Sequence, residues 1–349
     1  MAEEARRIGL IEAAAPDPGA VMAAFRLPGT PVAMTPVAGA WSNRVYRLET
    51  TAGAYAVKEL LNPWAEPRFD ERLAEAWRFE RAALAAEVAM PVPIADPATG
   101  DCAADVARED GSGDAEVRVH RWAAGQPATV GLPVATDVAC WAGRTLAALH
   151  GLRCRPADRG LFPVPGTATA DRWPELTEAA GRAGGASWRL LFDGAAGAVA
   201  TVVGLVREGG YHPAAEVMSH ADVSVKNVVL TSGGPVLCDW DVACPVVPRW
   251  EIADAALSLA AWEAHETSRE VVRAYRAAGG DDQPITPPDL GAALASRLDW
   301  IALNVEVALG LIPASDERRR IAVEPAARGL RTLPRRVEIA LGVESLLNV

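Results

Sequence analysis

The segment from Ser219 to Asn227 carries residue types at a spacing that suits the transfer of a phosphoryl group. It reads Ser-His-Ala-Asp-Val-Ser-Val-Lys-Asn, so Asp222 comes two residues after His220 and five before Asn227. A second acidic stretch, Cys-Asp-Trp-Asp, follows an apolar run and carries Asp239. Phosphoryl transfer needs one carboxylate to orient the attacking hydroxyl and accept its proton, and an Asn oxygen and a second carboxylate to hold magnesium ions. We therefore expect Asp222 to be the catalytic base, with Asn227 and Asp239 as the metal ligands.

This block resembles the catalytic and metal-binding loops of the aminoglycoside phosphotransferase family, relatives of protein kinases that include choline and homoserine kinases. The family typically has H-G-D-x-x-x-x-N and then Asp-Phe or Asp-Trp followed by an acidic residue. Ala221 stands here in place of the Gly, a small change that we expect to keep the turn. Ser224 stands where the family often has His or Lys, and Lys226, two residues further on, is the cation expected to reach the transferring phosphate. A polar loop that matches by coincidence is the alternative interpretation.

The stretch from Gly39 to Tyr46 resembles the family's nucleotide loop, in which G-G-x-S-N-x-x-Y is common. The resemblance implies that Ser42 and Asn43 belong to the cofactor site, with backbone donors and the Ser42 hydroxyl over the phosphates. Taken alone, the stretch fits a plain turn better, since Ala40 replaces the second Gly.

Lys58, in the strand-like stretch Ala-Val-Lys, resembles the lysine that binds the α- and β-phosphates of the nucleotide. Its expected partner is Glu80, on the helix that follows, because the resemblance places a glutamate there. Glu71 and Glu75 are rivals on the same helix. Such a pair would hold the lysine extended and charged. The alternative is an ordinary solvent-exposed strand lysine.

The stretch from Val117 to Gly125 resembles the hinge strand between the lobes of the family. Adenine would then bond to backbone groups near Arg121 and Ala123, so the side chains there carry little information. Without a nucleotide, the same stretch is an edge strand followed by a turn.

Four other polar residues are expected to support the site without taking part in the chemistry. His220 would hold the catalytic loop by hydrogen bonds, and Asp254 matches a family aspartate that braces this loop. Asp241 would help with the metal or with the shape of its loop. His150 ends a helical stretch, where a capping role is expected.

The elements that must position these residues change in type along the chain. Stretches at about 32–57, 101–107 and 115–122 are typical of strands, and one charged helix is expected between them, at about 66–89. Beyond residue 123 the pattern is mostly helical. We therefore predict an α+β chain with a two-lobed protein-kinase-like fold. Residues 1–122 would form the nucleotide-binding lobe, with a hinge at about 118–125, and residues 123–349 the helical lobe.

Composition excludes several other classes of protein. The chain has 349 residues and a net charge of −11, which disfavours binding to nucleic acid. Its five cysteines show no Cys-x-x-Cys spacing, which argues against a disulfide framework or a zinc site. The longest uncharged apolar stretch, Gly194 to Val206, is too short to cross a bilayer. We expect a cytoplasmic protein with no membrane partner that acts as a monomer or homodimer.

The acceptor is the least constrained part of the prediction. Between Glu251 and Glu306 there are ten acidic residues against four Arg and no Lys, which fits either solvated helix faces or a wall that binds cations. With the resemblance, this makes an aminoglycoside or other cationic antibiotic the first candidate for phosphorylation by ATP (or GTP) with Mg²⁺. The alternatives are a macrolide, a basic peptide antibiotic, an amino alcohol such as choline or homoserine, and a catalytically silent nucleotide-binding pseudokinase. Only fourteen residues separate Asp239 from Asp254, too few for the activation segment of a protein kinase.

Overall fold

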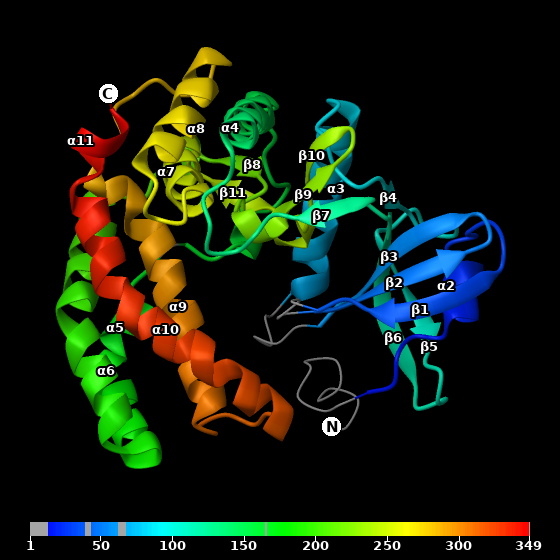
Figure 1. Cartoon of the computed structure of the whole chain (residues 1–349), viewed down its shortest axis with the longest axis horizontal. Helices are drawn as coiled ribbons and strands as arrows, with labels where there is room; N and C mark the ends of the chain where they lie inside the picture. Colours follow the sequence, from blue (N-terminus) through cyan, green and yellow to red (C-terminus); the bar gives the residue numbers. More distant parts are fainter. Residues whose placement is uncertain (1–12, 39–42, 62–67, 165, 349) are drawn as a thin grey trace. The chain divides into compact units, whose positions relative to one another are not determined.

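The computed structural model describes residues 13–38, 43–61, 68–164 and 166–348 (Figure 1). Contacts group the chain into two compact units. The first contains Met1–Gln126 and Val229–Asp241, and the second contains Pro127–Val228 and Val242–Val349. The lobe boundary at residue 122 stays a prediction, and the contacts add the short segment Val229–Asp241 to the first unit.

The first unit is built on a six-stranded antiparallel sheet with the strand order β1-β2-β3-β6-β4, in which β5 also pairs with β6. Its strands are β1 (Pro31–Pro36), β2 (Arg44–Thr50), β3 (Gly53–Glu59), β4 (Pro93–Ile94), β5 (Ala103–Ala107) and β6 (Asp114–Arg121). Val57 of β3 lies opposite Val119 of β6, and both are buried in the core. Because side chains alternate along a strand, the next pair, Lys58 and Arg118, is directed to the other face of the sheet.

Two helices accompany this sheet (Figure 1). The short α2 (Pro18–Ala24) begins with Asp17, whose side chain accepts a 2.7 Å hydrogen bond from the Ala20 amide. The longer α3 (Phe69–Ala85) is the helix expected from the sequence, and it buries one apolar face. It ends before the predicted residue 89, and Glu87, just beyond it, has a left-handed φ of 60°.

The second unit is mostly helical. Its helices are α4 (Thr136–Gly151), α5 (Ala168–Asp171), α6 (Trp173–Gly209), α7 (Pro248–Leu259), α8 (His265–Ala277), α9 (Gly291–Ala308), α10 (Asp316–Leu341) and α11 (Val343–Leu347). Helices α4 and α8 pack closely, because Gly143 has no side chain: a Cβ there would lie 2.3 Å from the carbonyl oxygen of Val271. An antiparallel sheet followed by a mostly helical part confirms the predicted α+β class.

Five short strands complete the fold. They are β7 (Gly125–Pro127), β8 (Val217–Ser219), β9 (Val228–Thr231), β10 (Gly234–Leu237) and β11 (Cys244–Val246). Strands β8 and β11 pair antiparallel, and β10, β9 and β7 form a three-stranded sheet in that order. Strand β8 leads directly into the loop that carries Asp222, so the pairing with β11 fixes the start of that loop.

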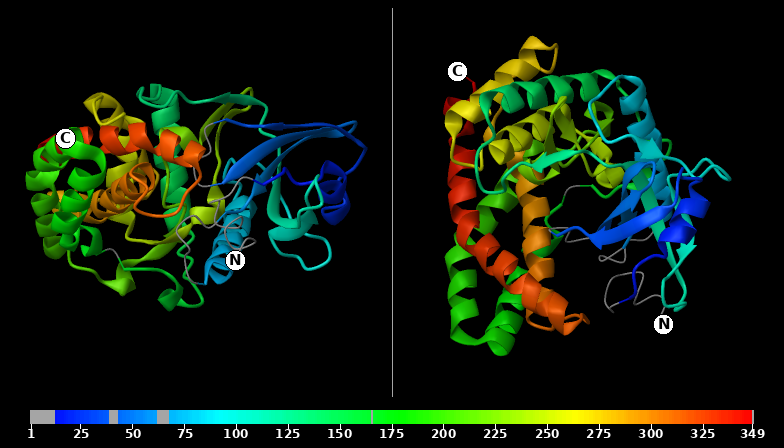
Figure 2. Two further views of the ribbon diagram at one scale, coloured as in Figure 1. Left: turned by 90° about the horizontal axis from the view of Figure 1, so that it is seen from below. Right: turned by 45° about the vertical axis from the view of Figure 1, so that its right-hand side comes forward.

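The helix α6 is long and apolar enough to cross a membrane by length and composition alone, with a mean hydropathy of 1.6 in its most apolar window. Gly185 interrupts its helical geometry with φ 74°. Figures 1 and 2 show α6, α9 and α10 side by side, and the contacts agree. One third of that apolar window is buried inside the structure. The expected absence of a membrane partner stays a prediction.

Candidate active site

The loop that carries Asp222, in the second unit, is held together by its own side chains. The Asn227 side-chain amide donates a 2.8 Å hydrogen bond from Nδ2 to the backbone carbonyl of Asp222. The Asp222 carboxylate accepts a 3.2 Å bond from the Ser224 hydroxyl on one oxygen, and the other lies 2.8 Å from Nζ of Lys226. The structure thus brings together Asp222, Lys226 and Asn227, three of the predicted residues.

A buried chain of hydrogen bonds supports this loop from behind. Ala221 has a left-handed φ of 64°, and its amide donates a 2.6 Å bond to Glu251 of α7. The other oxygen of Glu251 is 2.6 Å from Nε2 of His150, whose Nδ1 is 2.8 Å from the Tyr275 hydroxyl. Burial raises the pKa of Glu251, but the bonds from His150 and Ala221 outweigh it and hold that pKa below its usual value.

Glu251 therefore makes the bracing contact that the sequence assigned to Asp254, and it is not on a wall that binds cations. Both acids lie on α7 three residues apart, so helical spacing places them on the same side and cannot choose between them. His150 is part of this brace rather than a simple helix cap. Burial raises the pKa of Asp254 to about 6, with Arg336 and Asp222 acting in opposite directions.

The first unit gathers a second group around Lys58. Its ammonium contacts the carboxylate of Asp239 and lies 2.5 Å from Oδ1 of Asp241. Asn43 donates a 3.2 Å bond to Asp241 and accepts a 2.9 Å bond from the Leu61 amide. Burial would lower the pKa of Lys58, but the two carboxylates outweigh it and raise this pKa above its usual value. Three predicted residues, Asn43, Lys58 and Asp239, are thus close together.

The predicted pairing of Lys58 with Glu80 is wrong. Glu80 pairs instead with the guanidinium of Arg118, and its other oxygen lies 2.8 Å from Nε2 of His120. The register of the sheet gives the reason: Lys58 and Arg118 are directly opposite on β3 and β6. Two like charges in that position repel each other, so each needs its own carboxylate. Burial would raise the pKa of Glu80, but Arg118 and His120 outweigh it and lower this pKa.

The rival glutamates of α3 are also engaged elsewhere, Glu71 with Arg68 and Glu75 with Arg78. The signal that sequence reasoning missed is the alternation of Arg118 and His120 along β6, which puts two basic side chains on one face of the strand.

The remaining predicted cofactor residues are less well defined. Ser42 lies outside the described residues. Arg121 ends β6, and its amide donates a 2.8 Å bond to the Val92 carbonyl. The predicted backbone contact to adenine would therefore use Ala123, just beyond the strand, rather than the amide of Arg121.

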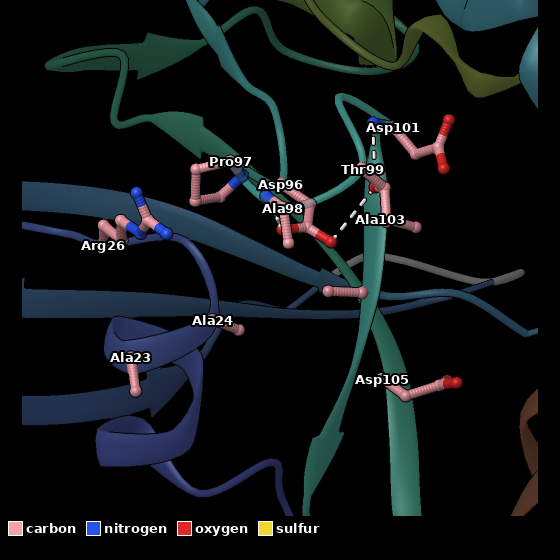
Figure 3. A pocket seen from close by; sticks show the side chains of 11 residues that line it. Ala23, Ala24, Arg26, Asp96, Pro97, Ala98, Thr99, Asp101, Ala103 and Asp105 are labelled. Carbon is pink, nitrogen blue, oxygen red and sulfur yellow. Dashed lines mark hydrogen bonds between the residues drawn. The ribbon is translucent and has the colours of Figure 1, made fainter.

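The first unit has a hollow of about 510 Å³ (Figure 3). The end of α2, the loop before β5 and the start of β5 line it, and Asp96 is one of its polar residues. Its carboxylate accepts bonds from the Ala98 amide and the Thr99 hydroxyl, so it holds the shape of its own loop. None of the predicted site residues lines this hollow.

Comparison with known proteins gives this geometry a context. The structures similar to this chain include a spectinomycin phosphotransferase in complex with ADP and spectinomycin, with TM-score 0.64 and 13% identity over 90% of this chain and 93% of that one. An aminoglycoside phosphotransferase from Alicyclobacillus acidocaldarius has TM-score 0.57 and 16% identity over 94% and 98%. A choline/ethanolamine kinase family protein from Mesorhizobium loti has TM-score 0.53 and 20% identity over 93% and 98%. These similarities confirm the predicted protein-kinase-like fold.

A search of curated proteins found no match. The sequence model of the Phosphotransferase enzyme family, in contrast, matches residues 33–288, which include both groups described above. The chain therefore belongs to the Phosphotransferase enzyme family and is a kinase that transfers phosphate to a hydroxyl-bearing small molecule.

Proposed function

We propose that the protein transfers the γ-phosphoryl group of ATP to a hydroxyl of its acceptor, with Asp222 as the base. Asp222 would orient this hydroxyl and accept its proton as the oxygen attacks phosphorus. Ser224 and Lys226 hold the two oxygens of this carboxylate, so its orientation is set by the loop itself. This arrangement is the observation that carries the proposal. Lys226 would also bring a positive charge to the transferring phosphate.

The metal ligands that we propose fit Mg²⁺. Magnesium prefers oxygen donors and is usually held by one or two protein groups together with phosphates and water. Asn227 offers its Oδ1, and Asp239 offers a carboxylate whose side chain is 32% exposed. Asp241 is only 8% exposed and is bonded to Lys58 and Asn43, so it suits a bracing role. Within the described ranges, no cluster of three or more His, Cys, Asp or Glu could hold a metal ion, as expected for this kind of site.

Lys58 would bind the α- and β-phosphates of ATP, and Asp241 would keep its ammonium in place while Asp239 binds the metal. Glu80 would act indirectly, because it fixes the side chain of Arg118. Arg118 lies opposite Lys58, and its Nη1 is 3.7 Å from Oδ1 of Asp241. The bound Mg²⁺ would neutralise charge on the phosphates.

For the acceptor, we propose a small hydroxylated amine, with an aminoglycoside or related cationic antibiotic as the first candidate. The names of the similar structures, which mention spectinomycin, aminoglycosides and choline or ethanolamine, support this class. The expected acidic wall supports it less, because Glu251 braces the loop and Glu306 pairs with Arg172. An amino alcohol is therefore the second candidate.

The test is ADP release with MgATP over a panel of aminoglycosides, spectinomycin, macrolides and amino alcohols. For any acceptor that turns over, Asp222→Asn should lower kcat by at least about 100-fold while ATP binding changes little. The exposed Asp282→Asn is the matched control and should behave as the wild type. Unchanged turnover in Asp222→Asn would remove this residue from the role of base, and ATP binding without turnover of any acceptor would favour a pseudokinase.

A further inference from the structure

Three helices of the second unit bring charged side chains into one group near the catalytic loop. Asp254 lies on α7, Arg297 on α9 and Arg336 on α10. The charges of both arginines and of Asp222 act on the pKa of Asp254, so the four side chains share one electrostatic environment. None of the motifs read from the sequence includes Arg297 or Arg336.

Each of the two arginines stacks on a tryptophan ring. The guanidinium carbon of Arg297 lies 4.4 Å from the ring centre of Trp300, and that of Arg336 lies 4.8 Å from the ring centre of Trp262. The Nε of Arg297 is buried and has no hydrogen-bond partner. In the part of the chain that the structure describes, no carboxylate forms a salt bridge with either guanidinium. Stacking fixes the plane of a guanidinium and leaves its N–H edge for another acceptor.

This arrangement is unfavourable for stability alone. Burial and, to a smaller extent, the neighbouring charge of Arg336 lower the pKa of Arg297 to about 10, while the charge of Asp254 acts in the opposite direction. Burial also lowers the pKa of Arg336. Elsewhere the chain solves the same problem with a carboxylate: Arg118 pairs with Glu80, and Arg108 lies 2.7 Å from Glu59. Arg297 and Arg336 are half-buried and, among the described residues, have no carboxylate in a salt bridge, and strongly perturbed titratable groups of this kind cluster at binding and catalytic sites.

We propose that Arg297 and Arg336 form an oxyanion subsite for a carboxylate on the acceptor. The planar fork of a guanidinium matches the two oxygens of a carboxylate, and two such forks on neighbouring helices would fix its position. The subsite would hold the acceptor hydroxyl within reach of Asp222. This inference rests on the proposed kinase function and changes the order of its acceptor candidates: hydroxylated amines that also carry a carboxylate come before polycations such as aminoglycosides.

The first experiment measures the rise in melting midpoint with malonate or inorganic phosphate against chloride at equal ionic strength. The variant is Arg297→Met with Arg336→Met, which keeps the side-chain stems over the tryptophan rings, and Arg335→Met on the same helix is the control. Wild type and control should show the rise, and the double variant should lose at least half of it without a lower starting midpoint. An equal rise in the double variant, or none in the wild type, overturns the proposal.

Four further variants remove ambiguities. If the double variant does not fold, Arg297→Lys and Arg336→Lys keep the charge but lose the fork, and each should give a smaller rise than the wild type and Arg335→Met. Lys58→Met tests whether the phosphate binds at the nucleotide site instead. If Lys58→Met abolishes the rise in melting midpoint and the arginine variants leave the rise intact, the subsite is contradicted. Asp222→Asn should keep the full response while losing turnover, which separates failure of the subsite from failure of the kinase proposal.

The second experiment compares acceptors that differ only by a carboxylate: serine with ethanolamine, threonine with 1-amino-2-propanol, and homoserine with 3-aminopropanol. For pairs that turn over with MgATP, kcat/KM should favour the carboxylated member at least about tenfold in the wild type and Arg335→Met. The double variant should lose this preference while the KM for ATP stays the same. A preference for the amine without carboxylate, or one that the variants leave unchanged, would contradict the subsite and leave the kinase function standing.

Discussion

Two pairs of buried or half-buried basic side chains, one in each unit, have different partners. In the first unit, Lys58 and Arg118 lie opposite each other on neighbouring strands, and carboxylates neutralise both. In the second unit, Arg297 and Arg336 stack on tryptophan rings instead. Carboxylates in contact with a cation fix its position, whereas a guanidinium without a salt bridge keeps its N–H groups for an anion. We therefore infer that the acids around the first pair position Lys58 for the phosphates, and that the second pair is available to bind a carboxylate.

Removing an acid from the first region should give the largest change in stability. Glu80→Ala leaves the fully buried Arg118 without its closest partner, so we expect the free energy of unfolding to fall by about 3–5 kcal/mol. Chemical denaturation measures this change. The control is Glu71→Ala on the same helix, whose exposed pair with Arg68 should matter by less than about 0.5 kcal/mol. Equal effects of the two substitutions would contradict the comparison.

Removing the acid Asp254 from the second region should raise the free energy of unfolding rather than lower it. The pKa of Asp254 is raised to about 6 in the folded protein from 3.8, so the folded state binds its proton more tightly than the unfolded state does. Stability from this group is present below about pH 4 and is lost as pH rises to about 6. Asp254→Asn should therefore match the wild type at pH 4 and exceed it at pH 7 by up to about 3 kcal/mol.

Melting curves at several pH values check this expectation, with Asp282→Asn as an exposed control. A variant less stable than the wild type at pH 7 would show that Asp254 stabilises the two arginines more than burial penalises it. The contrast with Glu80 would then be lost.

A smaller effect is expected from Ala221, whose φ of 64° is unfavourable for any residue with a Cβ. Ala221→Gly should raise the free energy of unfolding by about 1 kcal/mol, since glycine adopts this conformation without a clash. Differential scanning calorimetry would detect the higher melting midpoint. A lower midpoint would mean that the loop does not hold this residue in a left-handed conformation.

The sequence predicted best what is local. Asp222, Lys226 and Asn227 lie within six residues of each other, so their spacing alone indicated one loop. The pairing of Lys58 was wrong because it depends on strand register: only the alignment of β3 with β6 shows that Arg118 competes for Glu80. No local pattern contains that information.

The same limit applies to the helical unit. Glu251 and Asp254 share one side of α7, and only the position of the Ala221 amide shows which of them braces the loop. Arg297 and Arg336 are 39 residues apart on different helices, and their relation follows from the packing of α9 against α10. The α+β class was predictable because strand alternation and helical periodicity are properties of short segments.

The central proposal is that Asn227 and Asp239 are both ligands of the Mg²⁺ that binds with ATP. A double-mutant cycle on the Mg²⁺-dependent affinity for ATP, measured by isothermal titration calorimetry, tests it directly. Asn227→Ala and Asp239→Ala should each weaken ATP binding about tenfold. The double variant should lose less binding free energy than the sum of the two single losses, with a coupling energy of at least about 1 kcal/mol. Additive effects, or an affinity that neither substitution changes, would contradict the proposal.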